Sequence, residues 1–138
     1  PTSRHFMNKA RGYIFSRPFM GERVPQHVQN LVIRDYCTKN GIQYLLSATE
    51  YAMQGSYMIH EQLMSELSSL DGVVAYSLYQ LPENASDRKK IYQSIIKCKK
   101  IYHFALESLS MCNKPECERI EILWRVKQTL PNCYNYVS

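Results

Sequence analysis

The sequence predicts an α/β fold: one three-layer domain with a four-stranded parallel sheet in the order 2-1-3-4, flavodoxin-like or resolvase-like. Two observations support this. Four short apolar segments alternate with four longer segments whose apolar residues recur at helical spacing, which is typical of a parallel sheet covered by helices on both faces. The 138 residues also fit a single domain, since a chain near this length buries roughly 68–70% of its unfolded surface.

The first strand–helix unit has clear boundaries. Residues 11–16 form an apolar, aromatic run that is typical of a buried strand. A helix is expected at residues 25–40, because Pro25 suits a first helical turn and Asn40-Gly41 is a typical stop. Helical spacing predicts that the buried face of this helix consists of Val24, Val28, Leu31, Val32 and Tyr36.

The next two units repeat the same rhythm. Residues 42–47 are expected to form the second strand, and residues 58–70 the second helix. The third strand is expected at residues 73–77. The third helix follows at residues 87–99, with Ser86 as its N-cap because a serine hydroxyl accepts a hydrogen bond from a free backbone N–H of the first turn.

The last unit and the first residues complete the layout. Residues 101–106 are expected to form the fourth strand, and a helix that starts at Pro115 runs to about residue 129. Residues 1–6 resemble the remnant of an expression tag, because Met7 reads as a natural start. The expected single α/β domain therefore covers residues 7–138.

Composition narrows the classes of function. The chain has 17 basic and 12 acidic residues, a mild excess that suits an anionic ligand. No apolar run approaches the roughly 18 residues of a membrane span, and no secretion signal is seen, so the cytoplasm is the expected compartment. The five cysteines include no C-x-x-C pair, so we expect neither a metal site nor a cofactor. Nucleic acid is not an expected partner, because no basic face interleaved with aromatic residues is visible.

The loops after the first and third strands are where a ligand is expected. In open α/β sheets, ligands bind beyond the carboxyl ends of the strands, where the strand order reverses. Ser16 and Ser77 end these strands and are expected to line a polar pocket, although small residues also fit where strands meet loops. In the third loop, Tyr79 and Gln80 are candidates for holding a sugar or a base.

Charged residues near the first loop predict an anion site. Arg17 and Arg23 lie ahead of the first helix, whose N-terminus attracts anions, and Gln26 and His27 are in its first turn. The alternative is that these are ordinary surface charges around a loop. Glu50 follows the second strand and is, with His27, the candidate for catalysis, because a carboxylate there could act as a general base. The alternative for Glu50 is that it caps the next element or stays solvated.

The sequence resembles the "sporadic carbohydrate cluster" proteins, a bacterial family encoded in gene clusters for surface-sugar biosynthesis. The segments that carry the resemblance are residues 11–19, 24–37, 46–53 and 76–84, and the likeness covers nearly the whole chain after the tag. It implies a role in the synthesis of lipopolysaccharide or a related glycan. It assigns no reaction and no catalytic residue.

A second resemblance is to the catalytic domain of serine recombinases. The segments that carry this resemblance are residues 12–17 and 72–81, since that family begins with a G-Y-x-R-x-S strand and later carries an L-D-R-L segment. Here Ile14-Phe15 replace the arginine, Ser16 comes one residue early, and Tyr79-Gln80 replace the aspartate and arginine. The resemblance therefore implies a shared fold without DNA cleavage.

Three functions remain open on the sequence, so whether the chain is an enzyme is undecided. The first is the binding or modification of a sugar or nucleotide-sugar in surface-glycan biosynthesis. The second is a non-catalytic binding or scaffold subunit that partners a glycan enzyme. The third is a nucleic-acid-binding relic of a recombinase-like fold. A homodimer is also expected, through the last helix and the aromatic tail at residues 133–136.

Overall fold

The structure, a computed structural model, describes residues 8–19, 23–53 and 56–137. The strands are β1 (Lys9–Phe15), β2 (Gln43–Glu50), β3 (Gly72–Ala75), β4 (Ile101–Phe104) and β5 (Leu109–Met111). The α-helices are α1 (Gln26–Lys39), α2 (Met58–Ser65), α3 (Ala85–Cys98) and α4 (Lys114–Val137). Two short 3₁₀ helices are η2 (Leu67–Ser69) and η3 (Leu78–Gln80).

The sheet has the order β2-β1-β3-β4-β5, so the predicted order 2-1-3-4 is confirmed. The first four strands are parallel, as predicted. The sequence prediction missed β5, which pairs antiparallel with β4. Residues 105–108 turn the chain between these two strands, and Ser108 adopts a positive φ of 55° in that turn.

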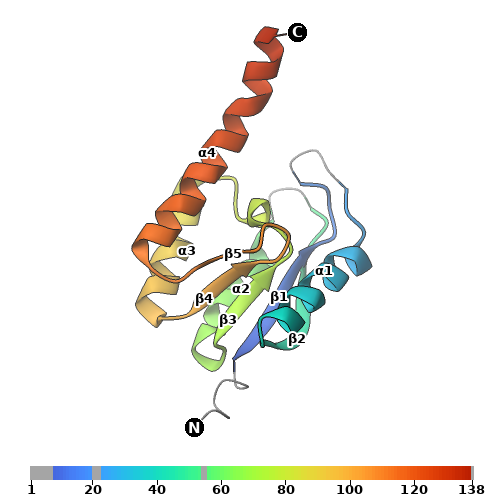
Figure 1. The fold of residues 1–138 in the computed structure, drawn as a ribbon, viewed down its shortest axis with the longest axis vertical. Helices are drawn as coiled ribbons and strands as arrows, with labels where there is room; N and C mark the ends of the chain where they lie inside the picture. Colours follow the sequence, from blue (N-terminus) through green and yellow to red (C-terminus); the bar gives the residue numbers. More distant parts are fainter. Residues whose placement is uncertain (1–7, 20–22, 54–55, 138) are drawn as a thin grey trace.

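The domain has three layers (Figure 1). On one face of the sheet, α1 buries Ile33 and Cys37 against β1 and β3. On the other face, α2, α3 and α4 cover a larger core that contains Tyr102 and Trp124. The α/β fold class is therefore confirmed, with α1 on the first face and α2, α3 and α4 on the second.

The buried face of α1 differs from the predicted one. Its buried residues are Gln29, Ile33 and Cys37, whereas Leu31 is 59% exposed. These three residues share an i, i+4, i+8 spacing, and the polar Gln29 at the first of these positions concealed that face in the apolar pattern. The helix bounds themselves differ from the predicted 25–40 by one residue at each end.

Close packing explains one glycine in the sheet. The Cβ of an alanine at Gly12 would collide with the Ser47 hydroxyl on the neighbouring β2. The register between β1 and β2 also shifts between Arg11 and Tyr13, around this glycine. Gly12 therefore lets β1 and β2 approach while their register changes.

The last helix is longer than predicted, and its C-terminal half projects beyond the rest of the molecule (Figure 1). The side chains of residues 130–138 lie outside the described ones, and so do residues 1–7. The homodimer expected through the tail and the expression-tag remnant at residues 1–6 therefore stay predictions. Across the described residues, no helix is long and apolar enough to cross a membrane.

Candidate functional site

The order β2-β1-β3 places the ends of β1 and β3 side by side, where the ligand site was expected. At this edge the structure forms two regions of opposite character. One is an open pocket beside the start of α1. The other is a closed network of buried polar side chains at the start of the third loop.

The open region is a pocket of about 360 Å³, which we call the arginine pocket. Its lining residues are Phe15, Ser16, Arg17, Arg23, Val24, Pro25 and Gln26. The structure thus brings together four of the predicted binding residues, namely Ser16, Arg17, Arg23 and Gln26. His27 is exposed in the same helical turn and is not part of this lining.

The start of α1 gives this pocket a positive helix end. Pro25 is the N-cap, and none of the described side chains caps the helix. The first turn contains no acidic residue that would compete for its free N–H groups. The backbone N–H groups of Val28 and Gln29 already bond to the Pro25 carbonyl. The first turn therefore adds a positive dipole end to the two arginine charges.

Arg17 is held in place by the protein. Its Nη1 donates to the carbonyls of Tyr51 (2.8 Å) and Met53 (3.1 Å). Its guanidinium also lies 4.3 Å from the centroid of the Phe15 ring and 5.1 Å from that of the Tyr57 ring. Arg17 is therefore a fixed positive charge at the end of β1, in contrast to the exposed Arg23.

The closed region is built around two buried amides, Gln29 on α1 and Gln80 in η3, which we call the amide pair. Gln80 Nε2 donates to Gln29 Oε1 at 2.8 Å. Gln29 also donates to the carbonyls of Phe15 and Val24 and accepts from the Phe15 N–H. Gln80 accepts from the N–H of Tyr76 at 3.2 Å. The amide pair thus joins α1 to the start of the third loop.

Ser77 and Tyr79 are also engaged with the protein. The Ser77 hydroxyl donates to Glu107 Oε2 at 2.7 Å and accepts from the Tyr79 N–H. Glu107 accepts in addition from the Leu78 N–H, while burial raises the pKa of its carboxyl. The Tyr79 ring packs edge-on against Trp124 with centroids 5.6 Å apart. The predicted ligand-binding role of Ser77, Tyr79 and Gln80 stays a prediction, and these contacts show what they do in the fold.

Glu50 is buried and joins β1, β2 and α2. Its Oε1 accepts from the Tyr13 hydroxyl (2.8 Å) and from the His60 backbone N–H (3.0 Å), and its Oε2 accepts from the Ile59 N–H (3.1 Å). The Ser16 hydroxyl donates to the Glu50 carbonyl. The carboxylate therefore caps the start of α2, as in the alternative interpretation, and a role in moving a proton stays untested.

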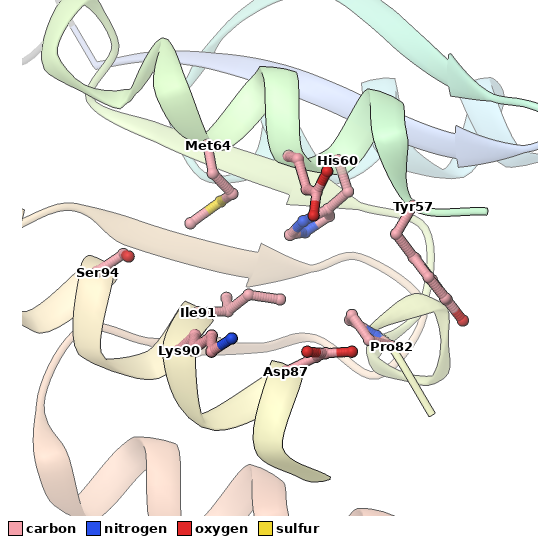
Figure 2. A pocket seen from close by; sticks show the side chains of 9 residues that line it. Tyr57, His60, Met64, Pro82, Asp87, Lys90, Ile91 and Ser94 are labelled. Carbon is pink, nitrogen blue, oxygen red and sulfur yellow. The ribbon is translucent and has the colours of Figure 1, made fainter. Parts of the chain in front are cut away.

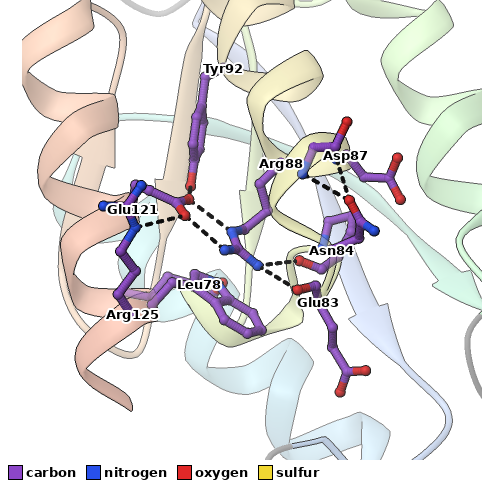
Figure 3. A network of polar contacts seen from close by, with 11 residues as sticks. Leu78, Glu83, Asn84, Asp87, Arg88, Tyr92, Glu121 and Arg125 are labelled. Atoms are coloured by element: carbon purple, nitrogen blue, oxygen red, sulfur yellow. Dashed lines mark hydrogen bonds and ion pairs between the residues drawn. The ribbon is translucent and has the colours of Figure 1, made fainter. Parts of the chain in front are cut away.

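Sequence reasoning missed the buried arginine network shown in Figure 3. Arg88 on α3 makes two 2.8 Å contacts with the Glu121 carboxylate of α4. Its Nη1 donates to the carbonyls of Pro82 and Glu83, and its guanidinium lies over the Trp124 ring. Arg88 therefore ties the end of the third loop to two helices. In the sequence, Arg88 belongs to a run of basic residues that is typical of a solvated helix face, and no local signal distinguishes Arg88 from Lys89.

Two solved structures share this fold. The N-terminal catalytic domain of TP901-1 integrase is 14% identical, with a TM-score of 0.57, and the alignment covers 93% of this chain and 98% of that one. A resolvase family site-specific recombinase from Streptococcus pneumoniae is 12% identical, with a TM-score of 0.64 and the same coverage of both chains. No family model and no curated protein matches this chain.

These comparisons correct the main functional expectation. The resemblance to the sporadic carbohydrate cluster family gains no support, because no family model matches and the structural neighbours are site-specific recombination proteins. The expected role in surface-glycan biosynthesis is wrong, and so are the sugar or nucleotide-sugar ligand and the glycan-enzyme partner. At 12–14% identity the likeness establishes the architecture: this chain has the fold of a resolvase-type recombinase catalytic domain.

Proposed function

We propose that this chain is a nucleic-acid-binding domain with a resolvase-type fold that does not cleave the strand it binds. The observation that carries the proposal is the arginine pocket. It combines two arginines with the start of α1 at the carboxyl edge of the sheet. The names of the two structural neighbours, a site-specific recombinase and an integrase, favour nucleic acid as the anionic ligand.

The chemistry of the pocket suits a phosphate group of a nucleic-acid backbone. Arginine guanidinium groups bind phosphate through paired N–H donors, and a helix N-terminus attracts an anion. Arg17 is held by the Tyr51 and Met53 carbonyls, so little conformational entropy is lost when it meets an anion. The net charge of +5 favours the approach of a polyanion. We assign Arg23 and Gln26 to the contact itself and Arg17 to the fixed charge behind it.

The residues that the recombinase motif would use for cleavage are replaced. Phe15 is buried where the G-Y-x-R-x-S strand has its arginine, and Arg17 follows where that strand has its serine. The Ser16 hydroxyl, one residue earlier, donates to the Glu50 carbonyl at 2.6 Å. Gln80, which replaces the arginine of the L-D-R-L segment, is buried in the amide pair. These replacements support binding without a serine nucleophile or a charged transition-state clamp.

Fluorescence anisotropy with a labelled DNA duplex, titrated at several salt concentrations, tests binding. We expect log K to fall linearly with log salt, because each phosphate contact adds roughly 0.9 to the slope. Arg23→Ala should reduce that slope by about 1. Arg119→Ala, which removes an exposed arginine of α4, is the matched control and should leave the slope unchanged. Absence of binding at low salt, or equal effects of the two substitutions, would overturn the proposal.

Cleavage is tested separately with supercoiled plasmid. We expect neither nicked DNA nor a covalent protein–DNA adduct after denaturation of the mixture. An adduct that Ser16→Ala abolishes would show that the chain does cut DNA. That result would refute the proposed absence of cleavage without contradicting the proposed binding of nucleic acid.

A further inference from the structure

A second cavity lies between α2 and α3, on the opposite face of the sheet from α1. We call it the α2–α3 cleft, and its volume is about 240 Å³. Figure 2 shows His60 and Met64 reaching into it from α2, while Asp87, Lys90 and Ile91 approach from α3. The volume is below the roughly 300 Å³ at which pockets for drug-sized ligands begin, so the cleft suits a single small ring system.

His60 provides a directed polar group in the wall of this cleft. The residue is only 2% exposed, and its Nε2 lies 2.8 Å from the Tyr102 hydroxyl. Among the described residues, no buried side-chain nitrogen or oxygen lacks a hydrogen-bond partner. None of these residues pairs with His60 Nδ1, so that atom has some accessible surface, and we place it toward the cleft that His60 lines.

The Tyr102 hydroxyl decides which nitrogen carries the proton. Burial lowers the pKa of His60 to about 4, so the ring is neutral at pH 7 and carries one N–H. Tyr102 is fully buried, and its hydroxyl hydrogen needs an acceptor. Within the described part of the chain, His60 Nε2 is the atom in hydrogen-bond contact with this hydroxyl, so we infer that the hydroxyl donates to it. The remaining proton is therefore on Nδ1, which presents an N–H donor to the cleft.

The remaining lining combines acceptors with apolar walls. Glu61 and Asp87 bring two carboxylates and Lys90 one ammonium group, so these three residues sum to −1. Tyr57, Met64, Pro82 and Ile91 supply the apolar surface. A ligand for this cleft needs a flat apolar body, an acceptor for the His60 and Lys90 donors, and N–H groups for a carboxylate. The negative balance disfavours a ligand that carries a phosphate.

We propose that the α2–α3 cleft binds a guanine-type base, as a nucleoside without phosphate. Guanine offers the O6 and N7 acceptors that amine and imidazole N–H groups recognise. On the adjacent edge its N1–H and N2–H₂ groups can donate to the two oxygens of one carboxylate. Its ring packs against the Met64 thioether and the Tyr57 ring. The cleft and the arginine pocket share no lining residue, although the Tyr57 ring also contacts the Arg17 guanidinium, so the nucleoside and the strand are tested at separate sites.

Saturation-transfer NMR with guanosine, adenosine, cytidine and uridine tests the ligand, each beside its 5′-monophosphate. We expect guanosine to give the strongest signal and its monophosphate to bind at least fivefold more weakly. Tighter binding of another nucleoside, or of the monophosphate, would overturn the assignment of the ligand. No signal from any of the four nucleosides would overturn the site.

Two substitutions locate the binding. Ser94→Phe fills the cleft from α3 and should weaken guanosine binding at least tenfold. Lys90→Ala should weaken it about threefold, whereas Lys89→Ala, the adjacent exposed lysine outside the cleft lining, should have no effect. This lysine pair keeps the test decisive should Ser94→Phe impair folding. Equal affinities of the two lysine variants, or undiminished affinity of folded Ser94→Phe, would place guanosine elsewhere.

The position of the His60 ring proton provides a further test, because binding of guanosine elsewhere on the surface would not change the resonance of this proton. A ¹H–¹⁵N spectrum of the histidine side chains should show the proton of His60 on Nδ1, and guanosine should shift that resonance. A proton on Nε2 would remove the donor on which the proposal depends. Because the DNA titration measures a different surface, failure here leaves the strand-binding proposal intact.

Discussion

The arginine pocket and the amide pair lie at the same edge of the sheet, but polar side chains are exposed in the pocket and buried in the pair. In the pocket, Arg23 and Gln26 are exposed. In the amide pair, Gln29 and Gln80 are fully buried, and each bonds to the other and to backbone groups. Polar residues at the carboxyl edge of a parallel sheet therefore need not form a ligand site. Such residues can instead be buried and bond to one another.

The difference follows from what burial demands. A buried amide that loses its partners costs about 1–3 kcal/mol for each unsatisfied group, so a buried pair is stable only when it is complete. In the amide pair, each side-chain oxygen and nitrogen has at least one hydrogen-bond partner among the described residues. An exposed guanidinium has no such requirement and keeps its donors for a partner. We therefore expect substitutions in the closed region to lower stability and those in the open pocket to change binding.

The largest effect is expected at Arg88, a second buried polar group, which ties the end of the third loop to α3 and α4. Arg88→Ala removes a 1% exposed guanidinium, leaves the Pro82 and Glu83 carbonyls without this donor, and leaves Glu121 with only the Tyr92 hydroxyl and the exposed Arg125. We expect a loss of about 3–5 kcal/mol in the free energy of unfolding, measured by urea denaturation. Arg125→Ala removes a 72% exposed partner 3.6 Å from the same carboxylate and should cost less than about 0.5 kcal/mol.

Arg88→Lys gives a second measurement should Arg88→Ala fail to fold. It keeps the charge but loses the two-pronged contact with Glu121, so an intermediate loss is expected. A loss as small as that of Arg125→Ala would mean that the network does not hold the third loop.

A matched pair of glutamines on α1 tests the comparison most directly. Gln29→Ala should lower the free energy of unfolding by about 3 kcal/mol, because the Phe15 and Val24 carbonyls, the Phe15 N–H and the Gln80 amide all lose their partner. Gln26→Ala, in the open pocket, should change it by less than about 0.5 kcal/mol and weaken DNA binding instead. Similar stabilities of the two variants would refute the distinction between the regions.

The smallest effect is a pH dependence that arises behind the open pocket, where Glu50 caps α2 and His60 is buried. The folded-state pKa of His60 is lowered by burial to about 4, and the nearby Glu50 opposes this shift only in part. The unfolded chain takes up a proton below about pH 6.5, but the folded chain does not until about pH 4. Stability is therefore complete above pH 6.5 and is lost as the pH falls toward 4. His60 alone should account for a loss of about 2 kcal/mol between pH 7 and pH 5 in urea titrations.

His103 complicates that measurement and also provides its control. It lies on the α1 face, hydrogen-bonded to the Tyr36 hydroxyl, and burial lowers its pKa to about 4 as well. His103→Gln should remove the contribution of His103 to the loss of stability at low pH and leave the contribution of His60. A flat stability profile between pH 7 and pH 5 in that variant would show that His60 is not held neutral in the folded state.

The features of the fold that were predicted correctly and those that were missed differ in how strong a pattern they leave in the sequence. The alternation of strands and helices and the order 2-1-3-4 follow from local pattern and chain connectivity, and the structure has both. The short β5 and the buried Gln29 face of α1 escaped prediction. A three-residue strand gives almost no periodic signal. A glutamine in a helix is expected to face solvent, and no residue near Gln29 in the sequence indicates that Gln80 lies opposite it.

The sequence by itself determined the fold class and the position of the arginines beside the first helix, because both depend on residues close together in the chain. The predicted strand order follows instead from the rules by which short right-handed connections join parallel strands. Only the tertiary structure decided which polar residues are buried. Gln29 and Gln80 are 51 positions apart, and Arg88 and Glu121 are 33 apart. A buried polar group is stable only when a distant segment supplies its partner, and no local pattern specifies that partner.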